Sequence, residues 1–576
     1  MPRIDISHLT LDNLRIHDWR QQALRDAVIK PELFYPYLLP CRVRLLIVVD
    51  GLDFSGLNFG LSTFVQTLLD IPGSHVRFQI TLAHIFNATP DQLLAAEPRI
   101  HRRIDRFRFD LDDHFTSELY DEVLLFGIAT SFVGRGNDST GTPYPTDRLS
   151  DRELGRITQF LNARGGLFAT GDHGSLGRPL SHAIPRARGM RLWQSTSAQD
   201  DLDQVSMVGQ RRNDTNRLGA DGVTQFDDQS DDVPQQVQPK LYSRTSGFTS
   251  ATWPHPLLCG PSGVIRVMPD HPHEGECVEP SDTGKSLVFD GEALGAEYPP
   301  ATDGGPRPLP EVISTNTVLS GTTSSGKQPT LSQSFGGIAA YDGHRAGIGR
   351  VVTDATWHHF VNINLVGDAD YPNNQVKGLG FLASPTGQAH FEAIKAYFRN
   401  IAVWLAPPER LACMHVRLAW RLVWHSRVLE AVLTTREIKL ESVSVSTLRL
   451  IGVHARDVLG RTASRCQSLR LVLDLVLERA WPELVPEIDP WLPETRRGKG
   501  DDILWFDPHP VLDIAFGAAL VALKENFPDP DPKDAESFDA KQVEAVIAEG
   551  ARLGVARAQD SVKGALRTAR SRLKLG

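Results

Sequence analysis

The chain has 576 residues, of which 41% are hydrophobic and 23% charged, and its formal net charge is −9. This length corresponds to about two to four domains, and the composition is typical of a globular protein with a large core. The net negative charge argues against nucleic acid and anionic membrane surfaces as partners, because both repel an acidic protein.

The cysteines and the apolar stretches bear on the compartment. Five cysteines are scattered along the chain without a C-x-x-C pair, and such an odd, sparse set argues against a disulfide framework. The polar residues at the start lack the apolar core of a signal peptide. The longest apolar stretch, residues 511–523, is shorter than the ~20 residues that span a bilayer. We therefore expect a cytoplasmic protein that does not cross a membrane.

Residues 1–40 are predicted to be an N-terminal extension, after which strands and helices alternate. Ser150 and Glu153 stand three residues apart, as in a capping box that begins a helix. The alternation indicates an α/β fold with a doubly wound, mostly parallel sheet. Strands are predicted at 41–51, 76–85, 119–128 and 167–171, and helices at 59–70 and 149–166.

The second half of the chain changes character twice. Residues from about 195 to 330 are rich in Asp, Gln, Ser, Pro and Gly, and we interpret them as a long insertion of irregular and β structure. A hairpin at 338–365 and an amphipathic helix at 387–405 then complete the α/β domain. Residues 409–576 follow a Pro-Pro pair and form a predicted all-helical domain.

Polar residues gather where the predicted strands end. In an open α/β sheet, ligands bind outside the carboxyl ends of the strands, so these residues are the candidates for a substrate site. They are Asp50 and Asp53 after the first strand, Asp172 and His173 after the fourth, and Asp354, His358 and His359 at the last.

His173 lies in the Gly-flanked turn "GDHG". Its unperturbed pKa is close to neutral pH, so it could act as a general acid or base with Asp172 orienting it. Alternatively, the glycines only permit close packing and the polar pair satisfies backbone amides. For "DATWHHF", alternation along a strand would let one of the two histidines face the cleft; we favour His358, with His359 as a packing residue or a substrate contact.

The loop "MPDHPHEGE" offers a third group of polar residues. His271, His273 and Glu274 could bind a divalent metal such as zinc or manganese. Alternatively, the two prolines make a rigid turn whose histidines bond to the backbone. His271 is also a candidate substrate contact.

Together the segments "LLIVVDG", "GLFATGDHG", "MPDHPHEGE" and "GRVVTDATWHH" resemble the class I glutamine-amidotransferase-like superfamily, and within it the ThuA-like (trehalose-utilisation-like) branch. The resemblance covers residues 41–408 and implies a flavodoxin-like or amidotransferase-like sheet. Gly171 and His173 take the places of the first glycine and the cysteine of the G-x-C-x-G elbow, which excludes glutamine hydrolysis through a thioester. His271-Pro272 and His358 or His359 match further histidines of that branch, which is linked to sugar metabolism.

Three functions remain open at this point. The first is an enzyme, a hydrolase or lyase, that transforms a small polar or carbohydrate-derived substrate with His173, Asp172 and His358 as catalytic residues and Asp53, His271, Asp354 and His359 as substrate contacts. The second is a non-catalytic module that binds a ligand, with residues 409–576 engaging a protein partner or a second copy. The third is a metal-dependent hydrolase that uses the loop histidines.

Overall fold

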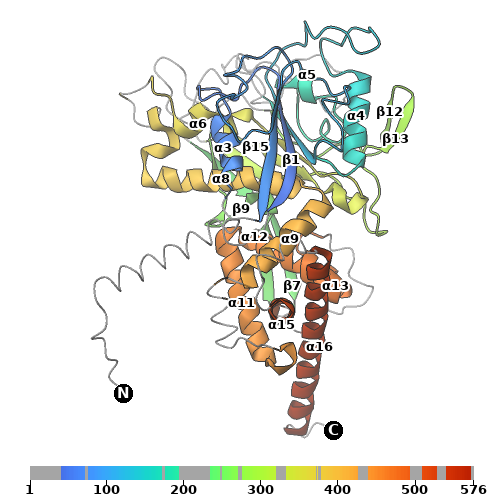
Figure 1. Ribbon diagram of the computed structural model, residues 1–576, viewed down its shortest axis with the longest axis vertical. Coiled ribbons are helices and arrows are strands. Elements are labelled where there is room, and N and C mark those ends of the chain that lie inside the picture. The colour runs from blue at the N-terminus through green and yellow to red at the C-terminus, as the bar shows by residue number, and fades with distance from the viewer. Residues whose placement is uncertain are drawn as a thin grey trace.

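The structure is a computed structural model, and it places an α/β part above a helical region (Figure 1). It describes residues 40–71, 75–171, 176–193, 234–246, 249–269, 275–318, 333–370, 373, 378–423, 425, 428, 439–492, 509–527 and 540–572. The predicted N-terminal extension lies outside these residues, apart from its last position.

The main sheet has ten strands in the order β11-β6-β14-β15-β16-β5-β4-β1-β2-β3. The six strands from β16 to β3 run parallel to one another. Their mainly apolar sequences suit strands covered on both faces, and β4 and β5 are buried along their whole length. The prediction of an α/β fold with a large, mostly parallel sheet is confirmed. These strands are β1 (Cys41–Val49), β2 (Val76–His84), β3 (Arg102–Ile104), β4 (Glu122–Gly127), β5 (Gly166–Gly171) and β16 (Val351–Asp354).

Helices cover both faces of the parallel strands. On one face α3 (Ser62–Leu69) and α8 (Pro385–Leu405) contribute Phe64 and Phe398 to a core shared with β1 and β2. On the other face α4 (Asp151–Asn162) packs through Leu154 and Ile157. The predicted capping box is confirmed, since Ser150 Oγ accepts from the Glu153 N–H at 3.3 Å and Glu153 Oε2 accepts from the Ser150 N–H at 2.9 Å.

The predicted insertion is not separate from the sheet. Three of its strands extend the main sheet and run antiparallel to their neighbours. They join it through β15, which itself pairs antiparallel with β16, the last of the parallel strands. The mixed composition of the insertion hid this pairing, since each strand is short and interrupted by polar loops. These three strands are β6 (Gln235–Pro239), β11 (Val267–Met268) and β14 (Glu311–Val318), and the strand that they join, β15 (Gln333–Tyr341), follows the insertion.

Short strands and turns outside the main sheet complete the α/β part. The hairpin β7–β8 reaches the helical region, where Trp491 Nε1 donates to the Pro254 carbonyl at 3.1 Å. These elements are β7 (Leu241–Ser246), β8 (Thr249–Pro254), η3 (Pro256–Leu258), β9 (Cys259–Gly260), β10 (Gly263–Val264), β12 (Ser286–Phe289), β13 (Glu292–Ala296), η4 (Gly343–Ala346), η5 (Trp357–His359), α5 (Arg178–Ser181), α6 (Asn362–Val366) and η6 (Gly380–Ala383).

The helical region surrounds a second hydrophobic core of its own. At its centre lies α15, and Gly452 and Gly517 let α11 and α15 touch backbone to backbone, because a Cβ at either position would lie 1.9 Å from a carbonyl oxygen of the other helix. No helix among the described residues has both the length and the apolar character needed to cross a membrane. The elements are α9 (Pro408–Val423), η7 (Leu440–Ser442), α11 (Val445–Thr462), α12 (Arg465–Leu471), the π-helix η8 (Val472–Leu477), α13 (Glu478–Ala480), η9 (Pro482–Leu484), α14 (Val485–Ile488), α15 (His509–Asn526) and α16 (Ala540–Arg572).

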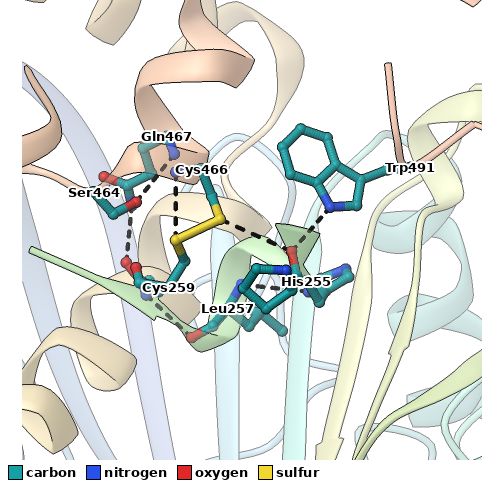
Figure 2. The surroundings of a disulfide bond; sticks show 9 residues. His255, Leu257, Cys259, Ser464, Cys466, Gln467 and Trp491 are labelled. Carbon is teal, nitrogen blue, oxygen red and sulfur yellow. Dashed lines mark hydrogen bonds between the residues drawn. A yellow bond between two sulfur atoms is a disulfide. The ribbon is translucent and has the colours of Figure 1, made fainter. Parts of the chain in front are cut away.

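Two disulfides join the α/β part to the helical region, so the prediction against disulfides is wrong. Cys41 on β1 pairs with Cys413 on α9, and Cys259 on β9 pairs with Cys466 on α12. Figure 2 shows the second bridge, where the Cys466 N–H donates to Cys259 Sγ at 3.3 Å. The partners are 372 and 207 residues apart, so cysteine spacing could not reveal them.

Candidate functional site

The carboxyl edge of the parallel strands is the place where an open α/β sheet binds its ligand. Strand order reverses at β1, because the chain adds β2 and β3 on one side and then β4 and β5 on the other. An open α/β sheet forms its crevice at such a reversal, which here falls between the ends of β1 and β4, beside the end of β5. The described site residues Asp53, Asp354, His358 and His359 lie at or after the ends of strands that share this one edge of the sheet.

Asp50 lies at this reversal of strand order, directly after β1. Its Oδ1 accepts from the N–H groups of Ile128 and Ala129, which follow β4, at 2.6 and 3.0 Å. The side chain is 1% exposed, and its Oδ2 has no hydrogen-bond partner among the described residues. Burial raises the pKa of Asp50 to about 6. A buried carboxyl group that titrates near neutral pH at this position is suited to acid–base chemistry or to binding a ligand.

Asp53, predicted to contact substrate, stabilises its own turn. Its Oδ1 accepts from the Ser55 N–H at 2.9 Å and from Ser55 Oγ at 2.6 Å. It also pairs through the backbone with Gly60, where a Cβ would lie 2.1 Å from the Ser55 carbonyl oxygen. This turn leads the chain from β1 to α3.

Asp354 and His359 form a buried pair at the end of β16. The His359 Nδ1 lies 2.7 Å from Asp354 Oδ1, and both side chains are fully buried. Tyr397 on α8 donates to Asp354 Oδ2 at 2.6 Å, and His359 Nε2 lies 3.4 Å from Gln235 Oε1. The carboxylate thus contacts one ring nitrogen of the histidine at ion-pair distance, an arrangement that can orient an imidazole for proton transfer or for structural support.

The strand predicted to run through "DATWHHF" ends earlier. Strand β16 stops at Asp354, and Trp357–His359 form the 3-10 turn η5, begun by Thr356, whose Oγ1 accepts from the His358 N–H at 3.0 Å. Strand alternation therefore does not separate the two histidines. His358, which we favoured for the cleft, is fully buried, stacks on Trp357 with ring centroids 4.1 Å apart, and bonds through Nδ1 to Asn364 Oδ1 at 2.8 Å.

The end of β5 is held next to this pair. Thr170 Oγ1 donates to the Asp354 carbonyl at 3.0 Å. The buried Arg191 donates to the carbonyls of Leu176 and Ala355, each at 2.7 Å, and to that of Gly171. The Arg191 guanidinium therefore links the two ends of the predicted elbow, at Gly171 and Leu176, to Ala355, the residue that follows Asp354.

Glycines allow the chain to return so closely after β5. A Cβ on Gly171 would lie 2.5 Å from the Gly177 Cα, and a Cβ on Gly127 would lie 2.7 Å from the same atom. Gly177 itself has a φ of +76°, which favours glycine. The small residues of the elbow thus serve backbone contact between β4, β5 and the start of α5.

Several predicted site residues lie outside the described residues: Asp172, His173, His271, His273 and Glu274. The roles assigned to them, including metal binding, stay predictions. Within the described ranges, no three His, Cys, Asp or Glu side chains are arranged to hold a metal ion.

Cys277 is the one cysteine outside the two disulfides, and it is buried against β15 and β16. Its Sγ is 3.4 Å from the Gly337 carbonyl and 3.5 Å from the Thr353 carbonyl. Burial raises the pKa of this thiol to about 12, so it stays protonated at neutral pH and is a poor nucleophile.

Sequence reasoning missed three residues that build this edge. Gln235 comes from the insertion, Tyr397 from the closing helix, and Arg191 from a turn that resembles no motif. Each acts through a contact between segments distant in sequence, so no local pattern marks it. Asp50, by contrast, was predicted at this edge, because it ends the first apolar run.

No protein-family model, curated protein or solved structure matches the chain. The site must therefore be interpreted from its own chemistry.

Proposed function

We propose that this chain is a ThuA-like protein that binds a small polar or carbohydrate-derived substrate at the carboxyl edge of its parallel strands and transforms it by acid–base chemistry, as a hydrolase or lyase. The proposal rests above all on the buried Asp354–His359 pair, which lies beside the end of β5. That is where the sequence resemblance puts the elbow with His173.

In this proposal the residues divide by their access to substrate. His173 is the acid or base that contacts substrate, with Asp172 beside it. Asp354 and His359 are fully buried, so they act as positioning residues that hold the end of β16 against the elbow. Asp50 faces the same edge from β1 and supplies a second carboxyl group.

The absence of a reactive thiol supports this chemistry. Four cysteines are tied in disulfides and the fifth is buried with a raised pKa. A thioester route of the amidotransferase type therefore has no nucleophile, whereas imidazole and carboxyl groups remain available for proton transfer.

A specific observation favours the alternative of a non-catalytic, amidotransferase-like module. His358, His359 and Asp354 have no exposed surface, as expected if polar groups at the sheet edge only stabilise the fold. In that case the edge would bind a ligand without turnover, and the helical region would engage a protein partner or a second copy. A metal-dependent hydrolase using His271, His273 and Glu274 with zinc or manganese remains a further proposal, for which elemental analysis is the direct test.

The cytoplasmic location predicted from the sequence now has an argument against it. Disulfides persist mainly in oxidising compartments, and two of them join the two parts of this chain. We propose that the chain folds in an oxidising compartment, where disulfides can form, and that it binds its small polar substrate in the same compartment.

The experiment is to incubate the purified chain with trehalose and with glucose and to follow both sugars by proton NMR. Conversion that is lost in His173→Gln supports the enzyme, with the exposed His101→Gln as the matched control. Asp354→Asn should lower kcat, leave KM unchanged and shift the pH profile. Binding without conversion would favour the module, and neither binding nor conversion would overturn a sugar substrate.

A further inference from the structure

A cavity of about 470 Å³ lies between the α/β part and the helical region, away from the carboxyl edge. On one side its wall comes from η4 and from Arg350, which precedes β16 and so marks the opposite edge of the sheet. On the other side the wall comes from α9, α12, η8 and α13. A cavity of this size is in the range that holds a small organic molecule.

Most charged groups in the wall are paired with one another. Asp342 binds Arg350 at 2.8 Å. Arg470 binds Asp474 at 2.9 Å and Asp489 at 2.8 Å. Arg479, a further lining residue, pairs with Glu544 on α16. These pairs fix the wall and satisfy each other, so they leave little net charge for a ligand to neutralise.

Glu478, Arg345 and His344 remain as candidate binding groups in a wall that also contains Asp303 and His415. Glu478 has no ion-pair partner among the described residues, and burial together with the charge of Asp474 raises its pKa to about 7. Arg345 has no acidic partner in the same ranges; its Nη2 donates only to the Pro306 carbonyl at 3.3 Å, and its Nε is buried without a partner. The Nε2 of the neighbouring His344 is likewise buried without a partner among the described residues.

The backbone that carries the acidic side is unusual. Residues Val472–Leu477 form a π-helix between Arg470 and Glu478. Such wide turns are rare and are frequently found at functional sites. Here the wide turn places Asp474 and Leu475 in the same wall as Arg470 and Glu478.

The remaining wall narrows the chemistry of the ligand. The carboxylates are not close enough together to form a metal site, since no cluster of three ligating groups occurs in the described ranges. Apolar side chains line the rest of the cavity, namely Leu411, Leu475, Val485 and Leu492. One partly ionised carboxyl group, one guanidinium and an apolar surface complement a zwitterion with an apolar side chain.

We propose that this cavity binds a small zwitterion of the amino-acid or dipeptide class, with its ammonium group at Glu478, its carboxylate at Arg345, and its apolar side chain against Leu411 and Leu475. His344 supplies an additional hydrogen bond. This site is separate from the carboxyl edge, so it does not depend on the function proposed above.

The experiment uses the whole oxidised chain and isothermal titration calorimetry with L-leucine, L-phenylalanine and leucyl-leucine. Each probe is compared with its N-acetyl form and with its amide form, which each lack one charge. We expect at least one zwitterion to bind, and both of its capped forms to bind at least about tenfold more weakly. Glu478→Gln and Arg345→Gln should each cause a similar loss, whereas the exposed Glu483→Gln and Arg449→Gln should bind as the wild type does.

Two results would overturn the proposal. One is that none of the three zwitterions binds the wild-type chain at concentrations up to about 10 mM, which is weaker than any specific site for such a ligand requires. The other is that a capped form binds as tightly as its parent, which would show that one charge is not recognised. Circular dichroism on each variant separates loss of binding from loss of fold.

Discussion

Cys41 and Cys413 are joined by a disulfide although 372 residues separate them in the chain. One sulfur sits at the start of the first strand and the other on the first helix of the helical region. The Cys41–Cys413 bridge and the Cys259–Cys466 bridge, the latter shown in Figure 2, link the two parts of the chain at two places. Both bridges therefore also restrain the walls of the charged cavity between these parts.

Breaking either bridge should destabilise the chain. Because each closes a long loop, replacing Cys41 and Cys413 together by serine should lower the free energy of unfolding by about 2–4 kcal/mol, as should the same change at Cys259 and Cys466. Urea unfolding with and without reductant measures this, and a variant lacking both bridges should no longer respond to reductant. Titration of the denatured, unreduced chain should find one free thiol; five would contradict the structure.

Closing the space between β5 and the start of α5 should be costly. Gly171→Ala places a methyl group 2.5 Å from the Gly177 Cα, and relieving that overlap should cost about 1–3 kcal/mol. Gly564 on α16 has nothing within 4 Å of its Cβ position, so Gly564→Ala should instead stabilise the helix, by about 0.5–1 kcal/mol. Thermal unfolding of the two variants should therefore shift in opposite directions, and equal shifts would contradict the packing described here.

Glu153 has two roles, so replacing it should lower the free energy of unfolding more than removing the cap alone. Its carboxylate caps α4 and also pairs with Arg135, and both side chains of that pair are fully buried. Ser150→Ala should cost about 1 kcal/mol. Glu153→Gln leaves the Arg135 charge without a counter-charge and should cost about 3–5 kcal/mol. Urea unfolding would contradict this order if Ser150→Ala proved the more damaging change.

Asp50 should make stability depend on pH. Its pKa is raised to about 6 in the folded chain, against about 4 when unfolded. Between these values the folded state keeps a proton that the unfolded state releases, so stability is greatest below pH ~4 and falls as the pH rises to ~6, by up to about 3 kcal/mol. Asp50→Asn should remove this decline, measured by urea unfolding from pH 4 to 7, while the exposed Asp91→Asn should retain it.

The sequence was informative where a signal is local. Buried apolar runs such as 41–51 predicted the parallel strands, and the spacing of Ser150 and Glu153 predicted the start of α4. It was uninformative where partners are remote. The Cys259–Cys466 bridge, the contact of Tyr397 with Asp354, and the pairing of β14 with β6 all join segments far apart in the chain, so no spacing rule could predict them.

The candidate site shows the same division. Position in the chain predicted that Asp354 and His359 lie at the end of one strand, because an apolar run ends there. It did not predict that His359 pairs with Asp354 while His358 turns to Asn364. That choice depends on the 3-10 turn begun by Thr356, whose hydroxyl accepts from the His358 N–H.

The strands contributed by the insertion also cover an edge of the sheet whose backbone groups would otherwise be unpaired. In the folded chain β14 occupies the hydrogen-bonding edge of β15. A shortened chain without residues 195–330 would leave that row of amide and carbonyl groups open along nine residues. Open edges of this kind recruit strands from other molecules, so such a truncation should accumulate as insoluble aggregate even if every residue of the parallel core were retained.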